Sequence, residues 1–227
     1  PVRAIKLAAF SLLLFLAVSY ILLGQGSNAM FLPILLWLPM IFVVLPLRQT
    51  QNYNLTLLLC GVVVFLCSAY LRVFVRDLPE FWLEKMRAFF DIIAQQAQVQ
   101  LTVEQLQYLS GQVHVWWLIL IQSCLFGTLF LARWWQSRLY YPGGFSSEFR
   151  RIQFSKNLVV ILGLLVVINL LERSMTMGFS LSTDILAILI VLFATQGLAV
   201  VHYRGSAVKA SKGWFIGLYM FLVLVPQ

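Results

Sequence analysis

Polar side chains at the edges of long apolar stretches are the residues of this chain best suited to chemistry. Asn169, Glu172 and Arg173 have i, i+3 and i+4 spacing, which places them on one face of a helix. Asp184 and Thr195 are eleven residues apart, about three helical turns, so they also share a face. Polar groups inside a bilayer are costly and often mark binding sites. The candidate pocket for a small ligand therefore comprises His114, Gln122, Asn169, Glu172, Arg173, Asp184 and Thr195.

Chemistry at helix ends offers a second explanation for the same residues. Asp184 follows Ser182 and Thr183, and a carboxylate in the first turn of a helix is favoured by the helix dipole and by capping. Glu172 and Arg173 can equally mark the end of a short span. The sequence alone leaves both interpretations open.

Enzymatic, cofactor and metal chemistry is not expected. The two histidines, His114 and His202, fall at opposite predicted membrane faces, and no HExxH sequence is present. The three cysteines, Cys60, Cys67 and Cys124, lie in apolar runs without a CxxC pair, as buried free thiols do. No Walker-type GxxxxGK[ST] sequence occurs in the chain. We therefore expect no catalytic residue, no cofactor, no metal and no ATPase activity of its own.

The elements that must position these residues are predicted to be membrane-spanning helices. The chain has 227 residues, of which 61% are hydrophobic and 11% charged, whereas soluble domains carry about 25% charged residues. A helix needs about 20 apolar residues to cross a bilayer. The sequence predicts an all-α, polytopic helical bundle that forms one membrane domain over residues 1–227. The expected spans are about 4–23, 29–47, 55–75, 113–133, 157–177, 183–202 and 213–227.

Between the third and fourth expected spans, residues 78–112 are too polar to cross a bilayer. Within 79–97 the apolar residues recur every three or four positions, which predicts an amphipathic helix lying in the membrane interface. Thr102 and Gln105 have the spacing of a capping box and predict a further short helix. The apolar stripe of the first helix consists of Trp82, Met86, Phe89, Phe90, Ile93 and Ala97.

Charge asymmetry predicts the orientation. With a cytoplasmic N-terminus, the cytoplasmic segments hold 11 of the 16 basic residues and only one of the eight acids, Glu148. The positive-inside rule favours this arrangement, which makes 78–112 extracytoplasmic and 136–156 a basic cytoplasmic loop. The net charge of +8 then reflects orientation in the lipid bilayer rather than binding to nucleic acid. The 11 basic residues are Arg3, Lys6, Arg48, Arg133, Arg138, Arg150, Arg151, Lys156, Arg204, Lys209 and Lys212.

The basic loop has a distinctive sequence. Pro142 and the two glycines that follow predict a turn, after which Ser146 or Ser147 is suited to cap a short helix. In this helix we expect the apolar residues Phe145, Phe149 and Ile152 to face the membrane and the basic residues to face lipid headgroups. The loop is either a linker that sets the orientation or a docking site for a partner. The docking candidates are Gly143, Gly144, Phe145, Arg150 and Arg151.

The order aromatic-Pro-Gly-Gly-Phe, followed by Glu-Phe and a basic patch, resembles the YybS-like family of predicted bacterial multi-spanning membrane proteins. The resemblance implies a multi-pass protein of the bacterial inner membrane that is distantly similar to the S components of energy-coupling-factor transporters. S components bind small molecules and dock on a coupling subunit through an Ala-x-x-x-Ala pattern, whose spacing Ala4 and Ala8 have. The expected function is thus small-molecule binding with an energy-supplying partner. The alternative is a scaffold or assembly subunit without a ligand of its own.

Overall fold

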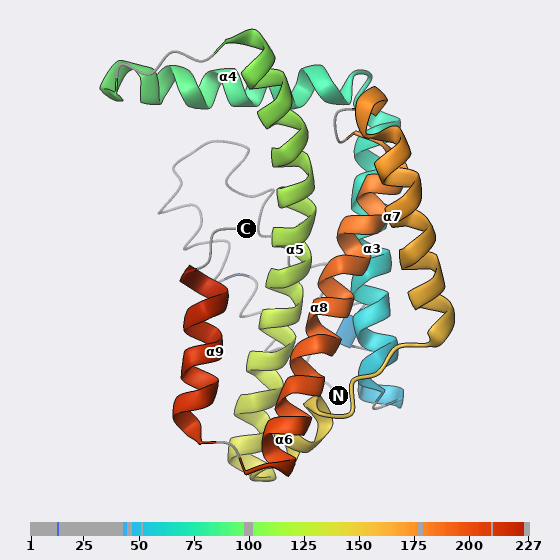
Figure 1. Cartoon of the computed structure of the whole chain (residues 1–227), viewed down its shortest axis with the longest axis vertical. Coiled ribbons are helices and arrows are strands. Elements are labelled where there is room, and N and C mark those ends of the chain that lie inside the picture. The colour runs from blue at the N-terminus through green and yellow to red at the C-terminus, as the bar shows by residue number, and fades with distance from the viewer. Residues whose placement is uncertain are drawn as a thin grey trace.

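The computed structural model describes residues 43–44, 47–50, 52–97, 102–176, 179–209 and 211–224, together with Leu13. The regular elements of the described residues are all helices, which confirms the expected all-α class for this part of the chain. The expected spans 4–23 and 29–47 lie largely outside it. In Figure 1, α3, α5, α7 and α8 run side by side, α4 lies across one end, and α6 lies at the other end. The helices are α3 (Tyr53–Phe74), α4 (Leu78–Ala97), α5 (Val103–Tyr140), α6 (Gly144–Phe149), α7 (Lys156–Thr176), α8 (Leu181–Ala207) and α9 (Lys212–Leu224).

Three of the described helices are long and apolar enough to cross a membrane. They are α3, α5 and α8, and they correspond to the expected spans 55–75, 113–133 and 183–202. The expected total of about seven spans is not established by the described residues. α7 packs along α8, and the described part of α9 covers 13 residues, Lys212–Leu224, at the expected span 213–227.

The longest helix, α5, corrects the boundaries expected from the sequence. The short helix expected after Thr102 and the span expected at 113–133 form one helix of 38 residues. The expected capping box is confirmed, because the Thr102 hydroxyl accepts from the Gln105 amide while the Gln105 side chain accepts from the Thr102 amide. No proline interrupts the sequence between Val103 and Tyr140, so the change from polar to apolar residues does not break the helix.

The core lies where α3, α5 and α8 meet. Leu57 and Val64 of α3, Leu118 of α5 and Leu192 of α8 are almost completely buried. On the outward faces of the same helices, large apolar side chains remain exposed, among them Val62, Leu120 and Ile190. A helix that is apolar on its packed and its exposed faces suits a lipid environment.

Helix α4 is amphipathic, as expected, but its packed face differs from the expected stripe. Leu78, Trp82, Leu83 and Met86 are buried, and α4 packs against α5. Phe89, which was expected on the same apolar stripe, is 55% exposed. The buried side chains described on α4 thus lie in its first half, the side chains of residues 92–97, including Ile93 and Ala97 of the expected stripe, lie outside the described ones, and the second half of the helix extends past α5 in Figure 1.

Helix α6 begins without the expected serine cap. Its N-cap is Gly143, with φ of 88°, a backbone angle that glycine adopts without strain. The Ser147 hydroxyl donates to the Gly144 carbonyl, and the Ser146 hydroxyl accepts from Arg150. Both serine side chains therefore make local contacts within the helix and do not cap it.

The apolar side of the α6 segment also points differently from the expectation. Phe145 and Phe149 pack against Phe130 of α5, with ring centroids 6.0 and 5.4 Å apart. Ile152 is buried in the core. Ile152 therefore does not face the membrane as expected, whereas Phe145 and Phe149 are half-buried against α5.

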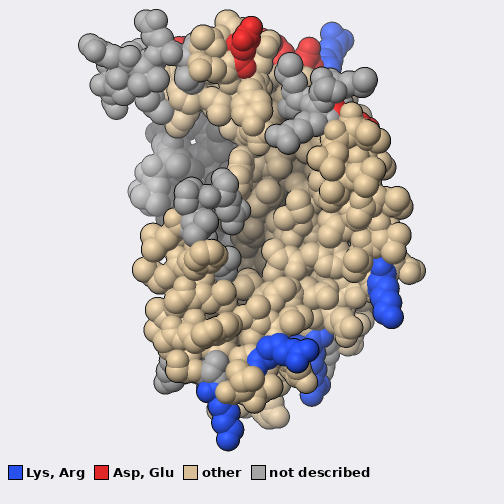
Figure 2. Space-filling model, viewed as in Figure 1, with Lys and Arg blue, Asp and Glu red and all other residues tan. Residues whose placement is uncertain are grey.

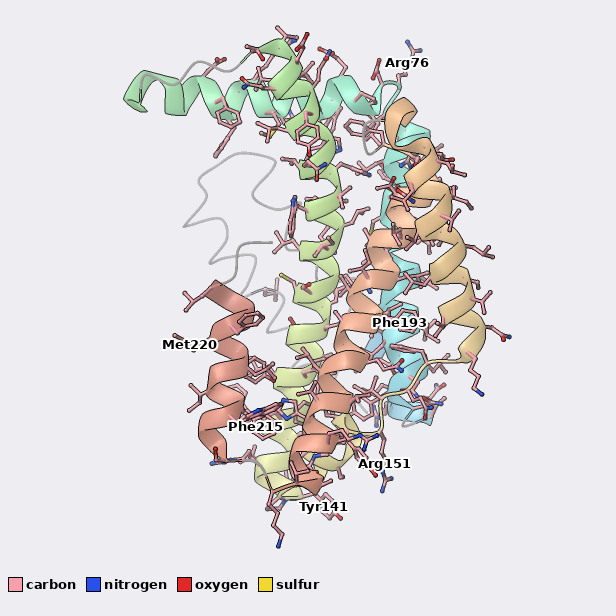
Figure 3. All side chains as sticks on the ribbon, in the orientation of Figure 1. Arg76, Tyr141, Arg151, Phe193, Phe215 and Met220 are labelled. Atoms are coloured by element: carbon pink, nitrogen blue, oxygen red, sulfur yellow. The ribbon has the colours of Figure 1, made fainter. Side chains whose placement is uncertain are left out.

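Charged residues separate between the two ends of the molecule. Figure 2 shows acidic side chains at the end occupied by α4 and several basic ones at the opposite end. Figure 3 places Arg151 at the α6 end, while Arg76 is a basic residue at the α4 end. The separation agrees with the charge asymmetry of the sequence.

Helix α9 contacts α8 through aromatic rings near the α6 end. In Figure 3 Phe215 lies on the side of α9 that faces the bundle, and Met220 lies on the outer side. The Phe215 ring stacks on His202 with centroids 4.7 Å apart. A Cβ atom at Gly205 would overlap the Phe215 ring, so a glycine is needed on α8 for this approach.

Candidate functional site

A buried charged cluster centres on Asp184, in the first turn of α8. Its Oδ2 accepts hydrogen bonds from Ser68 Oγ and from Arg72, whose Nε and Nη2 lie 2.9 and 2.6 Å away. Its Oδ1 lies 3.0 Å from His114 Nε2. The side chains of Ser68, His114 and Asp184 have no exposed surface. We call these four residues the Asp184 cluster.

The Asp184 cluster joins α3, α5 and α8, the three candidate spanning helices. Ser68 and Arg72 are four residues apart on α3, so both point to the same side of that helix. His114 comes from α5, and Arg72 also donates to the Phe179 carbonyl just before α8, at 2.7 Å. The carboxylate thus has hydrogen-bond donors at both oxygens, and the arginine compensates its charge.

Two buried polar atoms beside the cluster have no partner among the described residues. They are Trp82 Nε1 on α4 and His114 Nδ1 on α5. The two rings have centroids 5.8 Å apart, and Phe179 lies 5.7 Å from the imidazole. Trp Nε1 can only donate, and Nδ1 of a neutral histidine accepts when Nε2 carries the proton toward Asp184. We call this donor and acceptor the Trp82–His114 pair.

Gln122 and Thr195 of the expected pocket lie deeper in the bundle. Gln122 Nε2 donates to the Ile188 carbonyl of α8 at 3.2 Å, and its Oε1 has no partner among the described residues. Thr195 donates to the Val191 carbonyl of its own helix at 2.9 Å. Gln122 therefore links α5 to α8, whereas Thr195 bonds within α8.

Asn169 and Glu172 contact the start of α8 on the side of α7. Asn169 Oδ1 accepts from Thr183 at 2.7 Å, and Glu172 Oε2 accepts from Ser182 at 2.5 Å. The structure therefore brings His114 and Asp184 together, and it places Asn169 and Glu172 against the neighbours of Asp184. The side chain of Arg173 lies outside the described residues.

Sequence reasoning missed Ser68, Arg72 and Trp82 as members of this site. The sequence patterns did not single out Ser68 or Arg72, and they placed Trp82 only on an apolar stripe. A serine and an arginine four residues apart near a helix end are a weak signal by themselves. Their partner Asp184 is more than a hundred residues away in sequence, so only the fold brings the cluster together.

A second polar group joins α3, α5 and α6 at the other end of the bundle. Arg133 Nη2 lies 2.7 Å from Glu148 Oε1, and Tyr53 donates to Glu148 Oε2 at 2.8 Å. The Tyr53 hydroxyl also accepts from Arg133 Nε. The single acid of the basic loop is therefore paired with an arginine, which the sequence did not indicate.

The structure gives the candidate docking residues local roles. Gly143 supplies a positive φ, and a Cβ atom at Gly144 would overlap the Tyr141 ring. Phe145 packs on α5, Arg150 bonds to its own segment, and Arg151 is exposed. Ala4 and Ala8 lie outside the described residues. Docking through any of these residues stays a prediction.

Comparisons with known proteins identify a family but no characterised relative. The model of a family described as "Predicted membrane protein (DUF2232)" matches residues 90–227. No curated protein matches the chain, and no solved structure matches it. Among the described residues, no group of three or more His, Cys, Asp or Glu side chains is arranged to hold a metal ion.

Proposed function

The chain belongs to the family described as Predicted membrane protein (DUF2232), and from this premise we propose that it binds a small polar molecule as the membrane component of a transporter. In this proposal the protein resembles an S component, as the YybS-like sequence pattern implies. It carries out no catalysis itself and takes its energy from a partner protein.

The Trp82–His114 pair is the observation that carries the proposal. A buried donor or acceptor without a partner costs about 1–3 kcal/mol, so two of them side by side are unusual in a structural core. A bound molecule that offers one acceptor to Trp82 and one donor to His114 removes both costs. The neighbouring Asp184 cluster holds the imidazole in place through His114 Nε2.

The surroundings of the pair favour a neutral, flat ligand. Asp184 is already compensated by Arg72, so the cluster supplies no spare charge to an ionic ligand. Each member of the pair has a further aromatic neighbour, with centroid separations of 5.9 Å for Trp82–Trp117 and 5.7 Å for His114–Phe179. Aromatic rings pack favourably on planar groups.

Helix α4 supplies Trp82 and covers the site, so its displacement opens a path for the ligand.

The substitution Trp82→Phe tests the proposal. It keeps an aromatic ring but removes the Nε1–H donor, and no hydrogen bond between described residues is lost. We expect the wild-type protein, gently solubilised, to carry a small molecule that native mass spectrometry detects, and the variant to lose most of it at unchanged thermal stability.

The control for this test is Trp135→Phe, because Trp135 is exposed near the opposite end of α5. It should keep the bound molecule. A wild-type protein without any bound small molecule, or equal retention by both variants, contradicts the proposal.

A scaffold function is the second candidate, and an exposed aromatic side chain on α4 favours it. Phe89 of α4 is 55% exposed. Exposed aromatic side chains on an amphipathic helix suit a protein partner as well as a membrane surface. Co-purification with an ATPase pair and a small ligand supports transport. A partner bound at α4 with no small ligand supports a scaffold.

The orientation is part of the proposal and can be measured separately. We propose that α4 lies outside the cytoplasm, that α6 lies inside it, and that the protein resides in a bacterial inner membrane with its N-terminus in the cytoplasm. In a cysteine-free background, Glu84→Cys on α4 should react with a membrane-impermeant maleimide in intact cells. Arg138→Cys, near the end of α5, should react only after the cells are broken. The reverse pattern contradicts this topology.

A further inference from the structure

A cavity of about 630 Å³ lies at the α6 end of the bundle, away from the Trp82–His114 pair. It is formed by α3, α5, the α6 segment and the residues that precede α3. Its polar lining residues come from four separate parts of the chain, so the cavity is a product of the tertiary fold. The lining residues are Val44, Leu47, Arg48, Tyr53, Leu129, Ala132, Arg133, Gln136, Glu148 and Arg151.

The charges of the cavity do not balance among the described residues. Glu148 is compensated by Arg133, which lies 2.7 Å away and also donates to Tyr53. The side chains of Arg48 and Arg151 are exposed, and neither makes a hydrogen bond or ion pair with another described residue. The lining therefore presents two uncompensated guanidinium groups, which an anion can neutralise.

The rest of the lining is apolar. Val44, Leu47, Leu129 and Ala132 contribute aliphatic side chains next to the arginines. A small inorganic anion has no group that benefits from such a surface, whereas the glycerol and acyl portion of a lipid does. Two cationic groups beside an apolar wall fit an amphiphile with an anionic head.

We propose that this cavity binds the phosphate-bearing headgroup of an anionic membrane lipid. Arg48 and Arg151 bind the phosphate oxygens, because the planar guanidinium presents paired donors that match phosphate geometry. Arg133 is already held by Glu148 and Tyr53 and forms another part of the cavity wall. The apolar residues contact the first part of the lipid tails. This site is independent of the Trp82–His114 pair and of the proposed transport function.

The basic end of the molecule supports a lipid as the occupant. Basic residues at this end outnumber the single acid Glu148 and lie where three spanning helices end. Basic clusters beside spanning helices recognise anionic lipid headgroups, and each such residue contributes about a fivefold gain in affinity. Two arginines are therefore expected to contribute about 30-fold.

The test compares two double variants that remove equal charge from the same end of the protein. Arg48→Gln/Arg151→Gln removes the uncompensated cavity arginines, and Arg138→Gln/Arg204→Gln removes two exposed arginines that do not line the cavity. Delipidated protein is titrated with dioleoyl phosphatidylglycerol, dioleoyl phosphatidylcholine or inorganic phosphate, and bound molecules are counted by native mass spectrometry. Thermal unfolding of each variant checks that it remains folded.

We expect wild-type protein to bind one phosphatidylglycerol more tightly than phosphatidylcholine. The cavity variant should lose about 30-fold in affinity for that lipid, and the control pair should lose less than threefold. An equal loss in both variants would mean general surface attraction and overturns the proposal. Inorganic phosphate that displaces the lipid at equal concentration would indicate a soluble anion site, and equal binding of both lipids would exclude headgroup recognition.

Discussion

Replacing Asp184 by Ala is expected to lower the free energy of unfolding by about 3–5 kcal/mol, because it leaves a charged group without its buried partner. Arg72 loses the carboxylate 2.6 Å from its Nη2, and Ser68 and His114 lose the acceptor that both share. All three spanning helices lose a common contact. The effect should therefore appear as a loss of the whole bundle's stability rather than of one helix end.

The measurement is unfolding of the detergent-solubilised protein, followed by circular dichroism during titration with denaturing detergent. Asp91→Ala is the matched control, since Asp91 is exposed on α4. The double variant Asp184→Leu/Arg72→Met should recover most of the loss, because it removes both charges together. Equal stability of Asp184→Ala and the wild type would show that the cluster contributes little.

Gly61→Leu is expected to destabilise the bundle by about 1–3 kcal/mol, the usual cost of forcing extra atoms into a packed core. A Cβ atom at Gly61 would already lie 3.1 Å from Ile188 Cγ2 and 3.5 Å from Leu192 Cδ1. These residues belong to α8, so the larger side chain separates α3 from α8. Gln122 Nε2, 3.8 Å from the same Cβ position, would lose its place against the Ile188 carbonyl.

The control for this packing test is Gly127→Leu on α5, where a Cβ atom meets nothing within 4 Å. This variant should be neutral or slightly stabilised, because leucine favours a helix more than glycine does, by about 1 kcal/mol. Thermal unfolding monitored by tryptophan fluorescence compares the two variants. A Gly61→Leu protein as stable as Gly127→Leu would mean that α8 moves aside without cost.

Local patterns in the sequence predicted the helices well. The spacing of apolar residues predicted α4, and the Thr102–Gln105 spacing predicted the capping box that begins α5. These features depend on residues within a few positions of one another. The sequence did not predict the continuity of α5, because a change in polarity resembles a boundary even where no residue breaks the helix.

The features that could not be predicted depend on contacts between residues that are far apart in the sequence. Asp184 was interpreted either as part of a pocket or as a residue of a helix first turn, and it is in the first turn of α8 while also binding Ser68 and Arg72. The packing of Phe145 and Phe149 was not predicted because Phe130, their partner, lies on another helix. Neither set of contacts corresponds to a periodic pattern of residues in the sequence.

Helix α5 is continuous and contributes one side chain to each polar site: His114 to the Asp184 cluster and Arg133 to the ion pair with Glu148. His114 and Arg133 are 19 residues apart within its 38, which corresponds to about 28 Å along the axis. The unbroken helix therefore sets a fixed distance between the Asp184 cluster and the Arg133–Glu148 ion pair, and each of them fastens one end of the same helix to its neighbours.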